Sequence, residues 1–207
     1  MDLIDAFCTR SKCLEILFLM NDLKSVVRQG FYDSEIKKVE EFCKSNGLYL
    51  IKSKYKVLPV EEGYSNKGIL SSEGMNFAYL SKDELLANKA AYFEIIGDHF
   101  NLGITLGYPK CCSLFFQKEF PIVSMQDNNY ERSVIKNSKG DKFPYQNNIF
   151  RRHDDMVLIS HFPCNLECKE SKKIGTGFMK LLNSNFPNES ILLKKELRKS
   201  VHNLTFY

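Results

Sequence analysis

The sequence contains no tryptophan and no long apolar run. Its longest unbroken apolar stretch, Ile16–Met20, holds five residues, whereas a helix that spans a membrane needs about 20. The start of the chain, Met1–Asp5, carries acidic residues where a secretory signal peptide carries basic ones. We therefore expect a cytoplasmic protein that has no membrane partner.

The chain also lacks a glycine-rich phosphate loop, an internal repeat and a strong excess of one charge. Its 29 basic and 25 acidic residues give a net charge of +4, which is well below the imbalance of a dedicated nucleic-acid binder. We expect no nucleic-acid partner, and the mild basicity suits an acidic protein or a phosphorylated ligand. The length and the hydrophobic share of 43% predict a single domain over residues 1–207.

The hydrophobic periodicity predicts an α+β fold. Residues 1–47 are expected to form a helical N-terminal part, with a first helix that ends at Gly30 and a second that ends at Gly47. Alternation over Leu48–Val57 and Met75–Tyr79 predicts strands of a small antiparallel sheet.

Capping and helix-breaking residues mark two further helices. Ser81 and Glu84 form a capping-box pattern, which predicts a helix that runs to about Phe100. Pro109 is placed to be the first residue of the next helix, which Pro121 is expected to close.

The last third of the chain begins with a polar stretch. Residues 124–155 are rich in Asn, Lys, Asp and Arg, and we expect a polar loop or lid there. Met156–Ser160 is expected to be a buried strand of the sheet that delivers His161 at its end. Two helical patterns, Ile174–Leu182 and Pro187–Val201, are expected to pack as a C-terminal layer.

The seven cysteines fall into two groups. Their odd number and the expected reducing compartment argue for free thiols rather than disulfides. The first group lies in the predicted N-terminal helices, where the third member is expected to be a core residue: Cys8, Cys13 and Cys43. The second group is an adjacent pair and a pair four residues apart: Cys111, Cys112, Cys164 and Cys168.

The adjacent pair is placed to supply a nucleophile. A nucleophilic cysteine must be a thiolate, and the first turn of a helix lowers the pKa of a thiol through its unpaired N–H groups. With Pro109 as the first helical residue, Cys111 occupies the third position, where the amides are still unpaired. Lys110 adds positive charge nearby. We therefore expect Cys111 to be the nucleophile, with Cys112 as the alternative.

A cysteine nucleophile also needs a base. His161, 50 residues after Cys111, is the candidate base, and His153 is the second choice. A third residue normally orients the imidazole. The sequence leaves four candidates for it: Asp154, Asp155, Asn165 and Glu167. His99 and His202 fall in helical or terminal patterns, where a structural or exposed role is expected.

The second group of cysteines also supports a competing hypothesis, because it supplies the thiolates that a zinc ion or an iron–sulfur cluster requires, with His161 nearby. Two features count against it: the spacing lacks the C-x₂-C pairs of zinc ribbons, and the side chains of adjacent cysteines are expected to diverge. The metal-binding set would be Cys111, Cys112, Cys164 and Cys168. The nucleophile hypothesis, by contrast, requires no cofactor.

Two motifs carry a resemblance to a poorly characterised family of archaeal and bacterial proteins. Residues 106–112 read LGYPKCC and residues 161–168 read HFPCNLEC, which fit the patterns G-Y-P-x-C-C and H-x-P-C-x₃-C. The likeness extends loosely from Leu14 to Leu182. Some enzymes with a similar layout resemble papain-like and transglutaminase-like cysteine proteases that form amide bonds in peptide-like natural products, closthioamide assembly being one such setting.

The resemblance implies an α+β domain of the papain-like or transglutaminase-like type, in which one cysteine of the adjacent pair accepts an acyl group and His161 is the base. An amine acceptor or water would then resolve the acyl-thioester, so that an amide bond is formed or cleaved. Arg151, Arg152 and the basic C-terminal helix suit an acyl donor bound to an acidic carrier protein. The other two cysteines of the second group have no role in this hypothesis, which keeps the metal hypothesis open.

Overall fold

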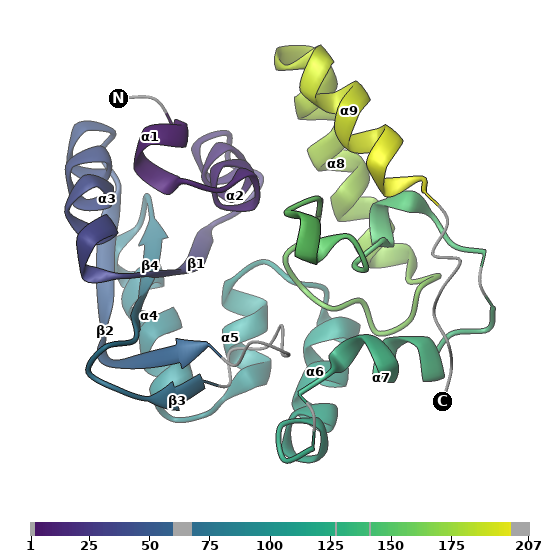
Figure 1. Ribbon diagram of the computed structural model, residues 1–207, viewed down its shortest axis with the longest axis horizontal. Coiled ribbons are helices and arrows are strands. Elements are labelled where there is room, and N and C mark those ends of the chain that lie inside the picture. Colours follow the sequence, from purple (N-terminus) through teal and green to yellow (C-terminus); the bar gives the residue numbers. More distant parts are fainter. Residues whose placement is uncertain (1–2, 60–67, 127, 141, 200–207) are drawn as a thin grey trace.

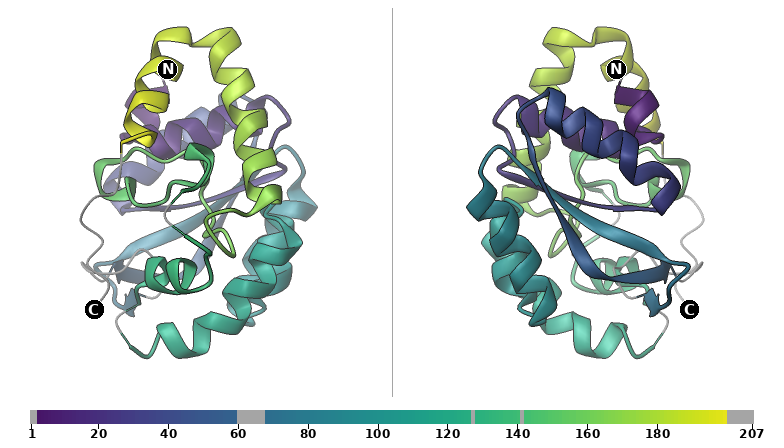
Figure 2. Two further views of the ribbon diagram at one scale, coloured as in Figure 1. Left: turned by 90° about the vertical axis from the view of Figure 1, so that its right-hand side faces the viewer. Right: turned by 90° about the vertical axis from the view of Figure 1, so that its left-hand side faces the viewer.

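The structure, a computed structural model, describes residues 3–59, 68–126, 128–140 and 142–199. Its N-terminal half forms a four-stranded antiparallel sheet with helices on both faces, and its C-terminal half packs beside this sheet as helices joined by irregular segments (Figures 1 and 2). The expected α+β class and antiparallel sheet are therefore confirmed. Within the described ranges, no helix has the length and apolar character needed to cross a membrane.

The sheet has the strand order β1-β4-β2-β3, and all of its pairs are antiparallel. Its strands are β1 (Val26–Phe31), β2 (Tyr49–Pro59), β3 (Gly68–Leu70) and β4 (Met75–Ser81). β2 and β4 confirm the strands that were expected from alternation. The order leaves β1 at one edge of the sheet, next to the C-terminal half.

The N-terminal part is less helical than expected. It comprises α1 (Leu3–Phe7), α2 (Arg10–Met20), β1 and α3 (Asp33–Ser45). The prediction of one helix up to Gly30 is wrong, because Asp22 adopts a left-handed φ of 58° after α2 and the chain then pairs with β4. Val26 and Val27 favour this outcome, since β-branched residues suit a strand. α3 is confirmed, and Gly47 follows it with a φ of 65°.

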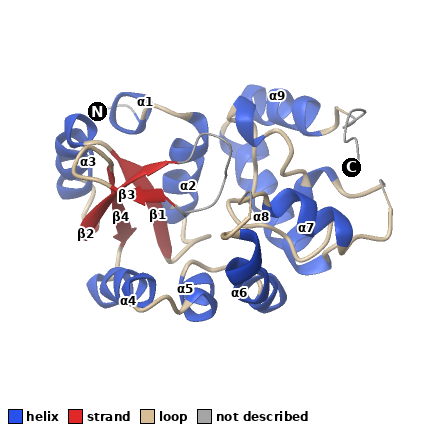
Figure 3. Cartoon of the chain, turned by 60° about the horizontal axis from the view of Figure 1, so that its bottom comes forward, coloured by secondary structure: helices blue, strands red, loops and turns tan. Residues whose placement is uncertain are grey.

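Successive residues of the strands point into two separate apolar clusters. Val27 and Leu80 face α1, α2 and α3, and Cys43 lies in this first cluster as expected. Phe77 and Tyr79 face the opposite side, where they pack against α4 (Glu84–Ile95) and α5 (His99–Thr105) (Figure 3). The sheet is therefore covered on both faces.

The expected single helix from Ser81 to Phe100 is instead the two helices α4 and α5. Asp83 rather than Ser81 is the N-cap, because its carboxylate accepts hydrogen bonds from two amides of the first turn at 2.8 and 3.2 Å. Ser81 belongs to β4, where its hydroxyl donates to the carbonyl of Ser25 at 2.7 Å. Gly97, with a φ of 70°, separates the two helices.

The C-terminal half contains α6 (Lys110–Val123), α7 (Tyr130–Lys136), η1 (Tyr145–Asn147), η2 (Arg152–Asp154), α8 (Lys169–Asn185) and α9 (Pro187–Leu197). The last two helices are confirmed, and Pro121 lies inside α6 rather than at its end. Segment 124–155 is not simply a polar loop or lid, because it contains α7, η1 and η2. Three of its apolar residues, Tyr130, Val134 and Ile149, are fully buried.

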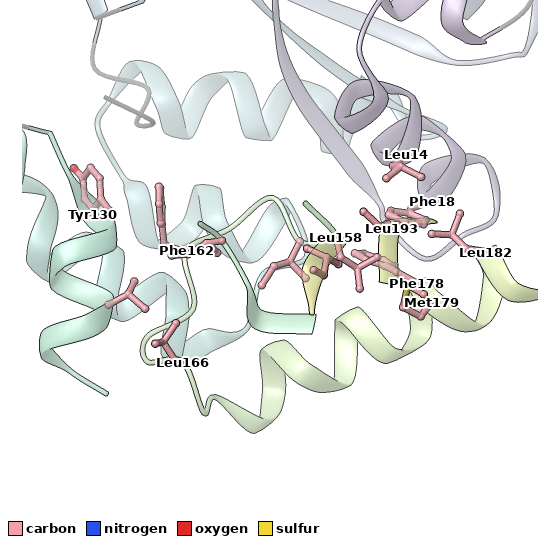
Figure 4. Packing of buried hydrophobic residues seen from close by; sticks show 14 of the residues in the cluster. Leu14, Phe18, Tyr130, Leu158, Phe162, Leu166, Phe178, Met179, Leu182 and Leu193 are labelled. Atoms are coloured by element: carbon pink, nitrogen blue, oxygen red, sulfur yellow. The ribbon is translucent and has the colours of Figure 1, made fainter. Parts of the chain in front are cut away.

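Only the middle of Met156–Ser160, residues 157–159, is buried, and the segment forms neither a strand nor a helix. The carbonyls of Ile159 and Ser160 accept hydrogen bonds from Arg152, and the segment does not belong to the sheet. It crosses a third apolar cluster, which lies in the C-terminal half and which Figure 4 shows from close by. In this third cluster Phe18 of α2 stacks on Phe178 of α8, with ring centroids 3.9 Å apart.

Candidate metal centre

Four cysteine side chains converge where α6 and α8 begin. Cys111 and Cys112 lie in the first turn of α6, Cys168 is the N-cap of α8, and Cys164 lies in the segment before it. The Sγ atom of Cys111 is 3.8 Å from those of Cys112 and Cys168, and the Cys112 and Cys168 Sγ atoms are 3.7 Å apart. With Cys164 included, all four sulfurs lie within 4.8 Å of one another.

The turn before α6 directs the adjacent pair into this cluster. Gly107 has a φ of 78°, and Pro109 follows it as the N-cap rather than as the first helical residue. The carbonyl of Pro109 accepts a hydrogen bond from the amide of Cys112 at 2.9 Å. Cys111 and Cys112 are therefore the second and third helical residues, one position earlier than expected. The expectation that their side chains diverge is also wrong.

Two asparagine side chains, one of them buried, fix the segment that carries the other two cysteines. Asn147 is fully buried, and its side-chain amide donates to the carbonyls of Leu166 and Cys168 at 2.9 and 3.0 Å. The Asn137 amide donates to the carbonyl of Cys164. These bonds satisfy carbonyls that the irregular backbone cannot pair with itself, and they hold the segment against the start of α6.

The spacing of the sulfurs fits a single metal ion. With metal–sulfur bonds of about 2.3 Å, the edge of a tetrahedral four-sulfur site is about 3.8 Å, and three of the Sγ pairs have this separation. A polynuclear iron–sulfur cluster distributes its ligands over separate iron atoms and therefore needs sulfurs that are farther apart. The four cysteines could hold one ion without a large rearrangement.

The surroundings of the cluster lower the pKa of the Cys168 thiol and raise the pKa values of the other three. The N-termini of α6 and α8 both point at it, and each presents unpaired amides and the positive end of a helix dipole. The amide of Cys164 donates a hydrogen bond to the Cys112 sulfur at 3.3 Å. Hydrogen bonds from Cys112 and Cys164 hold the pKa of the Cys168 thiol well below its ordinary value. Burial raises the pKa of Cys111, contrary to the expectation for a nucleophile at a helix start.

One hydroxyl separates His161 from the cluster. The Nε2 atom of His161 is 2.8 Å from the Oγ atom of Ser171, which in turn is 3.2 Å from the Sγ atom of Cys112. All three side chains are buried. Burial, together with the positive charge of Lys24, lowers the pKa of His161 to about 3, so its imidazole is neutral at physiological pH. His161 therefore reaches the adjacent pair only through Ser171.

The candidates for an orienting residue contact other groups. Asp155 accepts hydrogen bonds from two backbone amides at the start of α2, and Asp154 pairs with Arg151. Glu167 accepts a hydrogen bond from a backbone amide, and the Asn165 amide lies 3.6 Å from the Cys164 sulfur. Within the described ranges, none of these four side chains is hydrogen-bonded to His161.

Of the remaining histidines, the structure describes the side chain of His99. His99 packs against Phe120 with ring centroids 3.9 Å apart, and burial lowers its pKa, which agrees with a structural role. The backbone of His153 lies in η2. His202 lies outside the described residues.

Sequence reasoning missed two features of this region. Ser171 gave no signal, because a single serine in a helical pattern does not indicate its distant partners. The second feature is a cavity of about 290 Å³ between the sheet and the C-terminal half, whose lining includes Cys112, Tyr108 and His161. On the opposite side of the cluster, the exposed Cys111 borders a surface pocket lined by lysines and glutamates.

Comparisons with known proteins identify no characterised family. No known family and no solved structure matches the chain. Over 110 residues it is 28% identical to the uncharacterized protein MJ1106 of Methanocaldococcus jannaschii, which covers 53% of this chain and 54% of that protein. The chain thus spans about half the length of the curated relative that it matches. The resemblance to papain-like and transglutaminase-like enzymes stays a prediction.

Proposed function

We propose that the protein binds a single zinc ion through Cys111, Cys112, Cys164 and Cys168. The observation that carries this proposal is the separation of 3.7–3.8 Å between three of the four Sγ atoms. Four thiolates in a tetrahedral arrangement are a donor set typical of zinc. Mononuclear iron prefers the same donors, and metal analysis distinguishes the two.

A zinc ion here would have a structural role. Four protein ligands leave no open position for a substrate, which is typical of structural rather than catalytic zinc sites. The ion would join the start of α6 to the segment before α8. Zinc with four thiolates carries an excess of negative charge, and the two helix N-termini offset part of it.

Ser171 and His161 complete the site as outer hydrogen-bonding partners. If the Cys112 sulfur is a metal-bound thiolate, it accepts a hydrogen bond from the Ser171 hydroxyl. The Ser171 oxygen then accepts a bond from His161, which requires the neutral tautomer protonated at Nε2. Such outer partners orient the ligands of a metal and tune its affinity.

Acyl transfer in a papain-like or transglutaminase-like fold is the second candidate. The observation in its favour is the connection from His161 through Ser171 to Cys112, which makes Cys112 rather than Cys111 the thiol linked to the base. A carrier-bound acyl donor would remain the expected partner. This candidate gives no role to Cys164 and Cys168, whereas zinc binding uses all four convergent sulfurs.

Metal analysis combined with alkylation mapping tests the proposal. Protein purified under reducing conditions should contain near-stoichiometric zinc, and all four cysteines of the site should react slowly with iodoacetamide until a chelator is added. The Cys8→Ser variant is the matched control, because Cys8 is exposed and is not a member of the cluster, and it should retain the zinc. A metal-free protein with one rapidly alkylated cysteine would contradict zinc binding and favour acyl transfer.

A further inference from the structure

We propose that the cavity between the sheet and the C-terminal half binds a small apolar molecule that carries one negative charge, of the class of aromatic carboxylates. The proposal goes beyond zinc binding, since it assigns no ligand role to the sulfurs. It rests on the size and lining of the cavity and on one partly buried arginine.

The cavity has the size and the apolar surface of a small-ligand site. Its volume of about 290 Å³ lies at the lower end of ligand pockets, which start at about 300 Å³, and far exceeds the space that one water needs. Phe77 and Leu102 line it from the N-terminal half, and Phe116, Val157 and Phe162 line it from the C-terminal half. Aromatic rings on both sides suit a flat apolar ligand.

Three charged residues line this cavity, and two of them are paired. Glu15 forms a buried ion pair with Lys24, and Arg28 forms one with Glu94. Arg152 is the third charged residue of the lining. The cavity therefore contains one positive charge beyond the two pairs.

Arg152 has no carboxylate within ion-pairing distance in the described part of the chain. Its terminal nitrogens donate only to the carbonyls of Ile159 and Ser160, at 3.3–3.4 Å. Glu131 lies within its electrostatic reach, but burial raises the pKa of that carboxyl to about 7, so it neutralises Arg152 incompletely. The Nε atom of Arg152 is buried and has no hydrogen-bond partner. Withdrawing an unpaired charge from water is costly, and a ligand carboxylate would satisfy the guanidinium through charge-assisted hydrogen bonds.

Neutral polar groups around Arg152 can orient such a ligand without adding charge. The hydroxyl of Tyr108 is 3.2 Å from that of Ser160, and the ring of His161 packs beside Tyr108 with centroids 5.1 Å apart. These three residues line the cavity. A few polar groups on an otherwise apolar wall are the usual means by which a pocket fixes the orientation of its ligand.

Paired probes of equal shape test the charge requirement in the metal-loaded protein. We expect 3-phenylpropionate to bind at least about tenfold more tightly than 3-phenylpropanamide in isothermal titration. In Arg152→Gln this preference should disappear. Arg151→Gln is the matched control, because Arg151 pairs with Glu196 and Asp154 and does not line the cavity, and it should keep the preference.

Methyl NMR spectra of the wild-type protein keep the test decisive if Arg152→Gln does not fold. Nuclear Overhauser contacts from the phenyl ring should reach the methyl groups of Leu102 and Val157. Equal binding of the acid and the amide, no binding of either, or contacts confined to the outer surface would each overturn the proposal.

Discussion

The sulfurs of Cys111 and Cys112 lie 3.8 Å apart although the two residues are adjacent on one helix. Neighbouring helical side chains are separated by about 100° around the axis, so these two sulfurs meet only because both turn toward a third point. That point is Cys168, whose sulfur is 3.8 Å from the first and 3.7 Å from the second. The three sulfurs therefore form a nearly equilateral triangle, with Cys168 as its third corner.

Cys168→Ser should remove the zinc and lower the thermal stability of the protein. Loss of a ligand that binds only the folded state removes the stabilisation that it supplies, and we expect the Tm to fall by at least about 5 °C. Calorimetry with metal analysis checks this. Cys8→Ser should leave both quantities unchanged, and a zinc-loaded Cys168→Ser variant would contradict the assigned ligand set.

Ser171→Ala should weaken zinc binding without abolishing it. The change removes the hydroxyl between His161 and the Cys112 sulfur, and loss of an outer hydrogen bond typically costs about 10- to 100-fold in metal affinity. Competition with a chromogenic chelator measures this loss. Thr176→Ala on the same helix is the control, because the Thr176 hydroxyl donates to a carbonyl within α8, and it should keep the wild-type affinity.

The tautomer of His161 tests the direction of the hydrogen bonds between His161, Ser171 and the Cys112 sulfur. Nitrogen-15 NMR of the zinc-loaded protein should show a neutral ring protonated at Nε2 down to about pH 5, because burial lowers the pKa of this imidazole to about 3. A ring protonated at Nδ1 would mean that Ser171 donates to the histidine instead. The Cys112 sulfur would then lack its proposed donor.

Glu131→Gln should stabilise the protein at alkaline pH. Burial raises the pKa of Glu131 to about 7, above the value of about 4.3 in an unfolded chain. The contribution of this carboxyl to stability is therefore present below about pH 4.3 and is lost as the pH rises through about 7. Because solvent screens this partly exposed carboxyl, we expect only part of the full effect. The free energy of unfolding of the variant, measured with urea near pH 8, should exceed that of wild type by about 1–2 kcal/mol.

The control for that experiment is Glu41→Gln, which changes an exposed carboxylate of α3. It should alter the free energy of unfolding by less than about 0.5 kcal/mol. If Glu131→Gln and wild type show the same pH dependence of stability, Glu131 is ionised in the folded protein at neutral pH.

Phe18→Ala should be among the most destabilising single changes. The ring is fully buried and stacks on Phe178, which joins α2 to α8 across the two halves. Deleting a buried aromatic ring costs about 3–5 kcal/mol. Denaturant unfolding of the zinc-loaded protein measures this cost. Leu85→Ala, which shortens a side chain that is 61% exposed, should cost less than about 0.5 kcal/mol.

The sequence predicted those helices and strands that are determined by residues close together in the chain. α3 and α9 follow from apolar spacing and from the glycine or proline beside them, and β2 and β4 follow from alternation. Elements defined by distant partners were predicted less well. β1 depends on pairing with β4, and the middle of Met156–Ser160 is buried by neighbours that offer it no strand to pair with.

The candidate site shows the same division. The four cysteines could be singled out from the sequence, because their residue type and grouping indicate metal or thiol chemistry. Their convergence could not, because it depends on the buried Asn147 and on a helix start displaced by one residue at Pro109. Asp155 was a reasonable candidate near His161 in the sequence, but its carboxylate caps α2 instead.

The ligands of the proposed zinc ion come from two stretches of chain, and Cys112 and Cys164 are 52 positions apart. An ion that joins them acts as a removable cross-link around a long loop, and closing a loop of this length costs roughly 4 kcal/mol of chain entropy. Without the ion, packing of α7 and its neighbours must hold the loop closed unaided. Because the ion leaves on unfolding, both forms share one unfolded chain. Shortening the loop at the exposed residues 139 and 140 should therefore stabilise the metal-free and the loaded protein by the same amount.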